Sequence, residues 1–513
     1  MSLVSSMNIA SQALAVNQAA ITVVSNNIAN VDNENYSKLR VNLATVVTYS
    51  NLTNDSIAEA NSLSGVQISS ITRYSNEFLE SYFRTEKSEY SYYKEYSTIA
   101  SSIENLMNEL KETGLSEAFS DFYEAASALA DDPTNVTLRQ NYSSCLENVC
   151  SVFNSIHNDL TDLQNSLVGD YNAINSVDSS QIGTEITEAN TLLDQLAAIN
   201  QSIIKTNSTD SSSSSLLDQR DALLEELSSY MPITTEVNDN GTVDLSLGSY
   251  DLVTGGVVKG HLDTVTGTST NPAIINIVDP DDSTTVLYSD VNSEIDAGSI
   301  GAILKACGSD STELTISGVI DSLNTLAQTF ATTLNNIQVG VDASGTAMCL
   351  TNDYSALQVS SEYLLLNSGT GTTAGITAGN ISINSTISEN LYYIATARVT
   401  DPTDTSAVGD NSNITLVSES RDEVYSALGN QTFEDYLANE VSSIGLKVEN
   451  IDTRLATQSS VLESIKSTLS SETGVSLDEE LSDLIKYQQA YEAAARLFAV
   501  CSDLLETLVH LAE

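Results

Sequence analysis

The sequence predicts an elongated, multidomain α+β protein with a terminal α-helical coiled coil, a helical middle domain and an inserted β-rich outer domain. Two observations support this prediction. Apolar residues recur with helical spacing near both ends of the chain, and strand-like alternation is concentrated in the middle. The chain has 513 residues, of which 41% are hydrophobic, so it is long enough to build several cores.

The N-terminal helix is predicted from a segment without charge. Residues 1–31 contain no Asp, Glu, Lys or Arg, and their apolar residues repeat at alternating spacings of four and three, with Asn17 in one gap. This spacing is typical of a coiled-coil seam. An exposed helix ordinarily has a charged outer face, so an uncharged helix favours close packing among several neighbours. We assign seven seam residues to an assembly interface: Leu3, Met7, Ala10, Leu14, Ile21, Val24 and Ile28.

The C-terminal segment repeats this pattern in two helices. The first begins near Leu437, and Gly474 separates it from the second, where Ser476 with Glu479 has the spacing of a capping box. The two ends of the chain can therefore pair with each other. The assembly interface predicted here comprises Ile444, Val448, Ile451, Leu455, Leu462, Ile465 and Leu469 in the first helix and Leu484, Tyr487, Tyr491, Phe498, Leu505 and Leu508 in the second.

Simple energetics favour assembly through these helices. Burying the large seam residues of the N-terminal helix contributes on the order of 10 kcal/mol, at about 1.5–3 kcal/mol each. Ordering about 28 residues costs roughly 30–50 kcal/mol. We therefore hypothesise that the ends are mobile in an isolated chain and become ordered on assembly. The alternative is an ordinary intramolecular coiled coil.

The middle of the chain combines helices with hairpins. Residues 182–203 and 316–337 keep helical spacing. Residues 233–247 alternate around Asn240-Gly241, which is a strong hairpin signal, and further hairpins are predicted over 252–258 and 273–288. The chain therefore runs outward and returns, with both ends at one end of the molecule. The predicted domains are 1–45 with 437–513 (terminal), 46–231 with 297–337 and 391–436 (helical middle), and 232–296 with 338–390 (β-rich outer).

Composition excludes several functions. The chain has 19 basic and 69 acidic side chains, a net charge of −50, which argues against binding nucleic acid or an anionic membrane. No apolar run is long enough to insert into a membrane, and no cleavable signal peptide is expected. Cys145, Cys150 and His157 lack zinc-site spacing, so we expect no metal, no cofactor and no catalytic residues.

Several motifs carry a family resemblance. The first is Ser25-Asn26-Asn27-Ile28-Ala29-Asn30-Val31 followed by Tyr36, with Asn35 where the family usually has Gly before the Tyr. The others are Leu216-Leu217-Asp218-Gln219-Arg220-Asp221, Gly409-Asp410-Asn411-Ser412-Asn413, Gly474-Val475-Ser476-Leu477-Asp478-Glu479-Glu480, and Tyr487-Gln488-Gln489-Ala490-Tyr491 with Ala493-Ala494-Ala495-Arg496. With these motifs the chain resembles bacterial flagellar rod, hook and junction proteins. Within that group it is similar to the hook-associated protein 1 family of the hook–filament junction. The family motif residues are Asn26, Asn27, Asn30, Tyr36, Asp218, Arg220 and Arg496.

The resemblance implies a structural adaptor that joins hook to filament, outside the cell. Its implied partners are other copies of itself in a ring, the hook protein, a second junction protein on the filament side, and an export chaperone that binds the C-terminal helices. It implies export by the flagellar type III system without a cleaved signal peptide. The alternatives are another axial protein, such as a hook or filament subunit, and a secreted stalked adhesin whose β-domain binds a ligand.

Four single features allow two interpretations each. Arg220 either bridges subunits or makes a solvated local pair, and Arg496 either pairs across the assembly or is simply exposed. The tyrosines between Tyr82 and Tyr96 fit an interface or a core. Asn17 and Gln458 could fix the register of their seams, or be tolerated polar substitutions.

Overall fold

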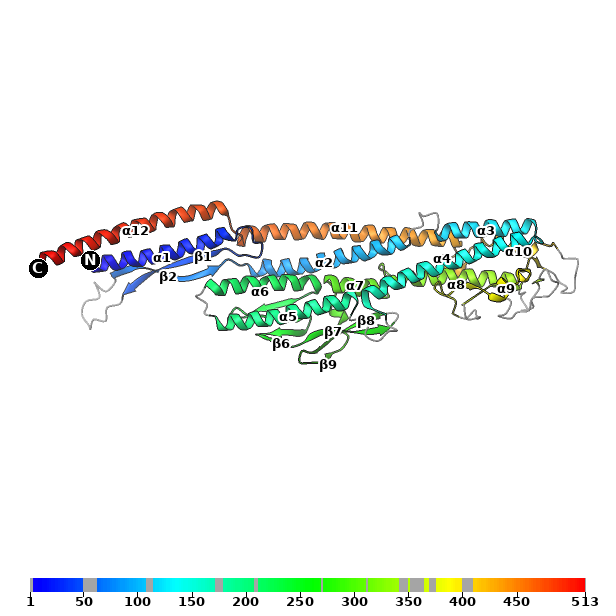
Figure 1. Ribbon diagram of the computed structural model, residues 1–513, viewed down its shortest axis with the longest axis horizontal. Helices are drawn as coiled ribbons and strands as arrows, with labels where there is room; N and C mark the ends of the chain where they lie inside the picture. The colour runs from blue at the N-terminus through cyan, green and yellow to red at the C-terminus, as the bar shows by residue number, and fades with distance from the viewer. Residues whose placement is uncertain are drawn as a thin grey trace.

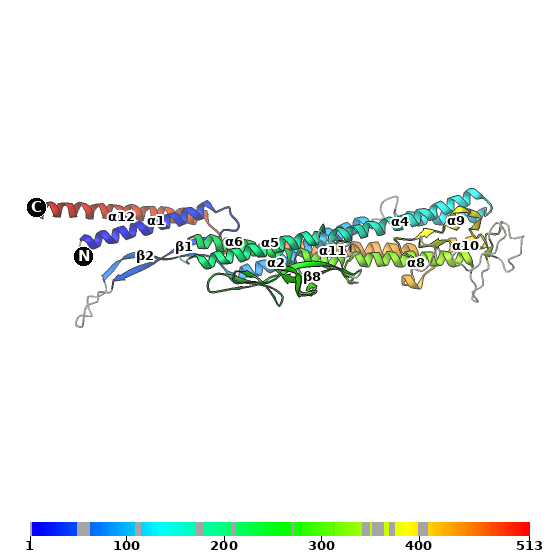
Figure 2. The ribbon, with the colours of Figure 1, turned by 60° about the horizontal axis from the view of Figure 1, so that its bottom comes forward.

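The molecule is long and narrow, and both termini lie at the same end of it, as the out-and-back path predicts (Figure 1). The computed structural model describes residues 3–48, 62–107, 114–170, 179–206, 211–268, 271–310, 312–340, 349–350, 364–368, 375–398 and 409–512. We call the part that carries the termini the terminal module and the remainder the body. The terminal module extends beyond the body along the long axis (Figure 2).

The terminal module consists of two helices and a hairpin. Helix α1 (Leu3–Ala29) packs along α12 (Leu477–Ala512) and also against the antiparallel strands β1 (Leu39–Thr48) and β2 (Ser62–Arg73). The predicted pairing of the two chain ends is thereby confirmed for α1 and α12. The hairpin was not predicted, and the boundary at residue 45 cuts through it, because β2 belongs to the terminal module and not to the helical middle domain.

The body is built around long helices. They are α2 (Glu77–Leu106), α3 (Leu115–Asp131), α4 (Val136–Val168), α5 (Gln181–Lys205), α6 (Ser211–Tyr230), α7 (Gly298–Cys307), α8 (Ile316–Val339), α10 (Ser412–Glu419) and α11 (Phe433–Thr473). Helices α5 and α8 match the segments predicted from periodicity. Rings from three different helices meet in the core, where Phe119, Phe330 and Phe433 lie with centroids 5.1–6.1 Å apart. This packing joins the outgoing and returning halves of the chain.

Helix α11 corrects one prediction. It packs along α2 in the body, whereas we had placed it in the terminal domain. Its seam residues Ile444, Val448 and Ile451 are buried in the common core of the body. A heptad pattern shows that one face of a helix is covered, but it does not identify the covering helix. The boundary lies at Gly474, where the helix ends with the Gly474 amide donating to the Ser470 carbonyl (3.0 Å).

Two small sheets lie against α5 and α7 on one side of the body (Figure 1). The first sheet consists, in spatial order, of β3 (Thr234–Val237), β4 (Val243–Leu247), β5 (Tyr250–Thr254) and β6 (Val257–Val258). The second consists of β7 (His261–Thr268), β8 (Asn271–Asp279) and β9 (Asp282–Tyr288). All strands pair antiparallel with their chain neighbours, so the three predicted hairpins are confirmed. The 3-10 helices are η2 (Asn292–Glu294), η3 (Leu391–Tyr393) and η5 (Ser426–Leu428).

The second half of the predicted β-domain lies elsewhere. Strands β10 (Cys349–Leu350) and β13 (Ala397–Arg398) form one pair, β11 (Leu366–Asn367) and β12 (Ser382–Ile383) another, and with α9 (Ser385–Glu389) they pack on α4, α8 and α10 at the end far from the termini. The side chain of Asn335 in α8 fixes this position. Its Nδ2 donates to the backbone carbonyl of Leu366 (2.9 Å), and its Oδ1 accepts from the backbone amide of Leu366 (2.8 Å). The described parts of 232–296 and 338–390 are thus separate, and much of 338–390 lies outside the described residues.

A buried arginine holds the far end together. Arg139 is fully buried and donates to the carbonyls of Pro133 (2.9 Å), Leu391 (3.1 Å) and Ile394 (2.8 Å) and to Thr396 Oγ1 (3.2 Å). Burial without a carboxylate lowers the pKa of Arg139 to about 10, so it remains a cation at neutral pH. The Gly409–Asn413 motif lies beside this cluster: Asn413 donates to the Ala395 carbonyl (3.0 Å).

Candidate functional site

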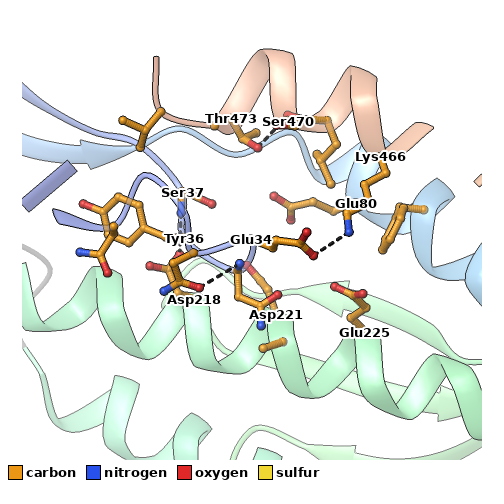
Figure 3. A pocket seen from close by; sticks show the side chains of 18 of the residues that line it. Glu34, Tyr36, Ser37, Glu80, Asp218, Asp221, Glu225, Lys466, Ser470 and Thr473 are labelled. Atoms are coloured by element: carbon orange, nitrogen blue, oxygen red, sulfur yellow. Dashed lines mark hydrogen bonds and ion pairs between the residues drawn. The ribbon is translucent and has the colours of Figure 1, made fainter. Parts of the chain in front are cut away.

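A cavity of about 420 Å³ lies where the terminal module meets the body (Figure 3). We call this region the joint. Its walls come from the loop between α1 and β1 (30–37), the first turns of α2, the middle of α6 and the end of α11. Protein cores are close-packed, so a cavity of this size marks a place where two parts of the molecule meet without packing tightly.

An arginine between two aspartates links the terminal module to the body. At the end of β2, Arg73 Nε lies 2.7 Å from Asp218 Oδ1 and Arg73 Nη2 lies 2.8 Å from Asp221 Oδ2, both on α6. The Arg73 side chain is only 8% exposed. Burial alone would lower the pKa of Arg73, but Asp221 and Asp218 raise it above its ordinary value. This is a buried ion pair, whose separation leaves uncompensated charge.

Arg220 lies next to this pair and reaches in another direction. Its Nη2 is 2.7 Å from Asp221 Oδ1, and its Nη1 donates to the carbonyl of Gly241 in the β3–β4 turn. With its side chain 7% exposed, Arg220 makes a local pair, as one of the two interpretations expected, but the pair is buried and not solvated. It links α6 to the first sheet and holds Asp221 in place for Arg73.

Asn27 is the centre of a buried network inside the terminal module. Its Nδ2 donates to the Leu39 carbonyl (2.9 Å) and to Glu480 Oε2 (3.0 Å), while its Oδ1 accepts from the Leu39 amide (3.0 Å) and from Tyr36 OH (2.8 Å). The side chain is 1% exposed. An amide can donate and accept at once, so this one residue connects α1, β1 and α12. Burial, with Asp218 and Glu480 nearby, raises the pKa of Tyr36 to about 12, so the hydroxyl remains a donor.

Further polar contacts cross the joint near the helix break. Lys38 Nζ lies 3.0 Å from Glu479 and 3.1 Å from Glu480, and the Lys38 amide donates to the Thr473 carbonyl (2.9 Å). Lys466 pairs with Glu34 at 2.6 Å, a contact visible in Figure 3, although both side chains are largely exposed. The contacts described across the joint are therefore mostly hydrogen bonds and ion pairs.

Glu80 lies in the wall of the cavity without a direct partner among the described hydrogen bonds and ion pairs. Burial, reinforced by Asp221, raises its pKa above the ordinary value. Arg73 and Arg84 oppose this effect only through space. Within the described residues no group of His, Cys, Asp and Glu side chains has the geometry of a metal site.

The structure brings together several family motif residues that are far apart in sequence. Asn27, Tyr36 and Asp218 all lie at the joint, and Arg220 supports them. Asn26 and Asn30 end α1, where Asn30 Nδ2 donates to the Asn26 carbonyl (2.9 Å). Arg496 lies away from the joint on α12, 83% exposed, with only Glu492 at 3.8 Å. Sequence reasoning missed Arg73, because nothing in its local sequence distinguishes it from any other residue at a strand end.

The predicted assembly residues fall into two groups. On α1 and α12 most of them lie buried or half-buried, as Ala10 and Val24 do, and only Tyr491 and Leu508 are clearly exposed. On α11, Ile444, Val448, Ile451 and Ile465 are buried in a single chain, and Leu455, Leu462 and Leu469 are half-buried. The four buried α11 residues therefore stabilise the body, and a role of the α11 residues in assembly stays a prediction.

The remaining ambiguous residues also find their positions. Asn17 Nδ2 donates to the Ala13 carbonyl of its own helix (2.8 Å), which favours the tolerated substitution, whereas Gln458 of α11 bonds to Glu86 of α2. Tyr96 is core, with its hydroxyl donating to the Leu314 carbonyl (2.9 Å). Cys145, Cys150, Cys307 and Cys501 are free thiols. Among the described residues, no helix is apolar and long enough to span a membrane.

Comparisons with known proteins agree with this architecture. A family model described as the flagellar hook-associated protein FlgK helical domain matches residues 100–348, and one for the flagellar basal body rod FlgEFG protein C-terminal region matches 468–511. Flagellar hook-associated protein 1 of Bacillus subtilis is 24% identical over 523 residues, covering 98% of this chain and 97% of the relative. The protein of the same name from Salmonella typhimurium is 24% identical over 583 residues, covering 98% and 99%.

A solved structure supports the same fold. The flagellar hook junction protein FlgK from Burkholderia pseudomallei superposes with a TM-score of 0.60 at 14% identity, covering 76% of this chain and 99% of the other. The matched domains occupy the body and α12 in the expected order, and the full-length relatives span the joint between them. Over nearly its whole length this chain is therefore similar to flagellar hook-associated protein 1.

Proposed function

We propose that this chain is a structural adaptor of the bacterial flagellum, located outside the cell, where it joins the hook to the filament. The observation that carries the proposal is the pairing of α1 with α12 at one end of a long molecule, with apolar surface left uncovered on that pair. The similarity to flagellar hook-associated protein 1 supports the same role. The proposed function is structural and not catalytic.

The uncovered surface on α12 is a row of four large apolar side chains. Leu497, Val500, Leu504 and Leu508 are 48–54% exposed, and their spacing of three and four puts them on one side of the helix. A soluble chain seldom leaves such a row in water, and patches of this kind mark interaction sites. We propose that this row contacts neighbouring copies, and that the exposed seam residue Tyr491 does so on another side of the helix.

The outer face of α1 has the complementary character. Its exposed residues repeat at spacings of four and three and carry no charge: Val4, Asn8, Ser11, Ala15, Gln18, Thr22, Ser25 and Ala29. Small uncharged side chains permit close approach of another helix without the repulsion expected between chains of charge −50. Contacts between two different faces of identical subunits are heterologous, and such contacts generate rings or helical tubes.

The finer partners follow from this arrangement. We propose that a ring of copies binds the hook protein on one side and a second junction protein on the filament side. Before assembly the apolar row on α12 needs a cover, and an export chaperone that binds the C-terminal helices would supply it. Export through the flagellar type III system, without a cleaved signal peptide, fits ends that complete their packing only outside the cell.

The joint has a mechanical role in this proposal. The paired terminal helices carry the continuity of the tube, while the body accommodates the mismatch between a bending hook and a stiff filament. The cavity and its polar contacts support this division, because ion pairs and hydrogen bonds around open space constrain orientation less tightly than a packed apolar core. Exchanging the body for that of another family member with unchanged motility would contradict it.

A complementation experiment tests the adaptor function. In cells lacking the chain, we expect loss of filaments and shedding of flagellin into the medium, both restored by the wild-type gene. Leu504→Glu, in the α12 row, should fail to restore filaments although the variant is found in the medium. Leu446→Glu is the matched control, because Leu446 is 64% exposed on α11 of the body. Intact filaments in the deletion strain would refute the proposal.

A further inference from the structure

An exposed row of three aromatic side chains marks the start of α2. It consists of Tyr74 (37% exposed), Phe78 (76%) and Tyr82 (42%), which we call the aromatic row. The rings of Phe78 and Tyr82 stack with centroids 6.4 Å apart and planes 18° apart. Among the described residues Phe78 is the most exposed large apolar side chain.

The row contributes little to the fold of its own chain. Burying a Phe side chain stabilises a folded chain, but at 76% exposure most of that stabilisation is not realised for Phe78. Tyr82 keeps its outward position through Glu86, which in turn bonds to Gln458 of α11. Aromatic residues held outward in a row are typical of contact surfaces, where Tyr and Phe are enriched.

The aromatic row lies directly beside the joint. Asn76, between Tyr74 and Phe78 in the chain, donates to Glu472 Oε2 near the end of α11 (2.7 Å). Arg40 of β1 donates to Tyr74 OH (3.0 Å), and Tyr487 and Asp483 of α12 lie close enough to Arg40 to act on its charge. The row is therefore next to the first turns of α12, across the boundary between body and terminal module.

Those first turns of α12 are apolar on their outside too. Leu477, Leu481 and Ile485 are 44%, 41% and 55% exposed, at a helical spacing of four. These three side chains add apolar surface on the terminal-module side of the joint. They lie on a different side of α12 from the row at Leu497–Leu508, which the proposed function assigns to neighbouring copies.

Charge decides what can cover this surface. Glu77, Asp478 and Glu479 flank the aromatic row and the first turns of α12. Lys38, Arg40 and Lys486 offset part of this negative charge and Asp483 adds to it, so another negatively charged surface gains no attraction there. Most of this chain is such a surface. The exception is α1, the one α-helix in the described part of the chain with no ionised side chain.

We propose that the aromatic row, with Leu477, Leu481 and Ile485, is a further contact between copies that receives the uncharged outer face of α1 from a neighbour. This inference depends on the proposed function in one respect only, namely that the partner is a second copy of this chain. Because the surface includes residues on both sides of the joint, a neighbour that covers it holds the terminal module at a fixed orientation to the body. Assembly and joint geometry are then coupled.

Photo-crosslinking in the assembled flagellum tests this contact. p-Benzoyl-phenylalanine is incorporated at position 78 in cells that carry the variant as their only copy, and isolated hook–filament structures are irradiated. We expect an adduct between two copies, with the partner peptide inside residues 3–29. The matched control is position 392, because Tyr392 is 44% exposed in η3, which packs against α9 at the opposite end of the body, and should give no such adduct.

A second position separates the two proposals. The same photo-crosslinker at position 504 should join two copies if the α12 row assembles. An adduct at 504 without one at 78, or an adduct at 78 to a different protein or to another region of the chain, overturns this inference and leaves the adaptor function standing. No adduct at 504, with filaments intact in the deletion strain, would refute the adaptor function itself. Phe78→Ser should lower incorporation at the junction about tenfold, as expected for an interface anchor, and leave the helical circular dichroism spectrum of the free chain unchanged.

Discussion

Removing Arg73 is expected to loosen the joint. In Arg73→Met the aliphatic side chain retains similar volume, but Asp218 loses its cation and Asp221 keeps only Arg220. The side chains of Arg73, Asp218 and Asp221 are 8%, 13% and 15% exposed, so solvent screens them weakly. Removing one partner of a buried ion pair costs about 3–5 kcal/mol. We take the lower end, about 3 kcal/mol, because the neighbouring cavity admits water.

Amide hydrogen exchange measures this loss locally, which suits a chain whose parts need not unfold together. About 3 kcal/mol corresponds to an increase of roughly 100-fold in the opening of peptides from β2 and the middle of α6. Peptides of α4, remote from the joint, should exchange as in the wild type. Arg40→Met is the matched control, since Arg40 lies on the same hairpin, is exposed and donates to Tyr74.

A double-mutant cycle checks the assignment to the pair. Asp218→Asn alone should cost less than Arg73→Met, and the double variant should cost less than the sum of the two. The reasoning would be refuted if Arg73→Met opened β2 and α6 no more than Arg40→Met does. Strict additivity of Arg73→Met and Asp218→Asn would likewise show that the two side chains do not stabilise the joint together.

Three further predictions concern other buried polar groups. Glu80→Gln should raise the urea midpoint of unfolding at pH 7 but not at pH 3. Because the folded chain raises the pKa of Glu80, the ionised carboxylate destabilises the fold at pH 7, and this destabilisation disappears when the pH falls below the pKa of Glu80 in the unfolded chain. An unchanged midpoint at pH 7 would contradict this reasoning. Asn27→Ala leaves the buried Leu39 amide and carbonyl unpaired and should lower protection of α1 in assembled structures, at about 1–3 kcal/mol per group. Asn17→Ala, which removes only a bond within its own helix, is its control and should have far less effect. Arg139→Lys should lower the thermal midpoint of the body, because one ammonium cannot replace donors to four acceptors; equal midpoints would exclude a stapling role.

Local patterns predicted most helices and hairpins, because helical spacing and turn chemistry depend on residues that are close together in the sequence. The terminal helices, the break at Gly474 and the hairpins around Asn240-Gly241 all follow from spacing or turn chemistry. The β1–β2 hairpin is one exception, since it was not predicted. Another is the serine run at the start of α6, because a run of serines by composition alone favours a flexible linker. Serine is acceptable in a first helical turn, so composition alone could not distinguish the two cases.

The joint could not be predicted in the same way. Its contacts connect residues 145 positions apart for Arg73 and Asp218, and 453 apart for Asn27 and Glu480. The resemblance to flagellar proteins singled out Asn27, Tyr36, Asp218 and Arg220, but gave no reason for them. The structure supplies the reason for this chain: each satisfies a buried polar group or charge where two parts of the molecule meet.

The placement of α11 and of the β segments failed for a related reason. A seam such as Ile444, Val448 and Ile451 predicts that one face of α11 is covered by another helix. The heptad pattern alone does not distinguish α2 from α1 as that helix. The strands near Leu366 were assigned to the hairpins of 233–288 because both are β-like, whereas Asn335 of α8 binds them at the far end. Partner choice of this kind depends on single polar residues.

The hairpin turn between β8 and β9 has a practical consequence. Residues 279–282 lie at the tip of a sheet, away from the joint, with Asp281 and every residue of β9 exposed. Foreign sequence inserted there meets neither the helices that build the tube nor the core that holds the body. This turn is therefore a suitable place to attach an epitope or a fluorescent reporter for following the protein in living cells.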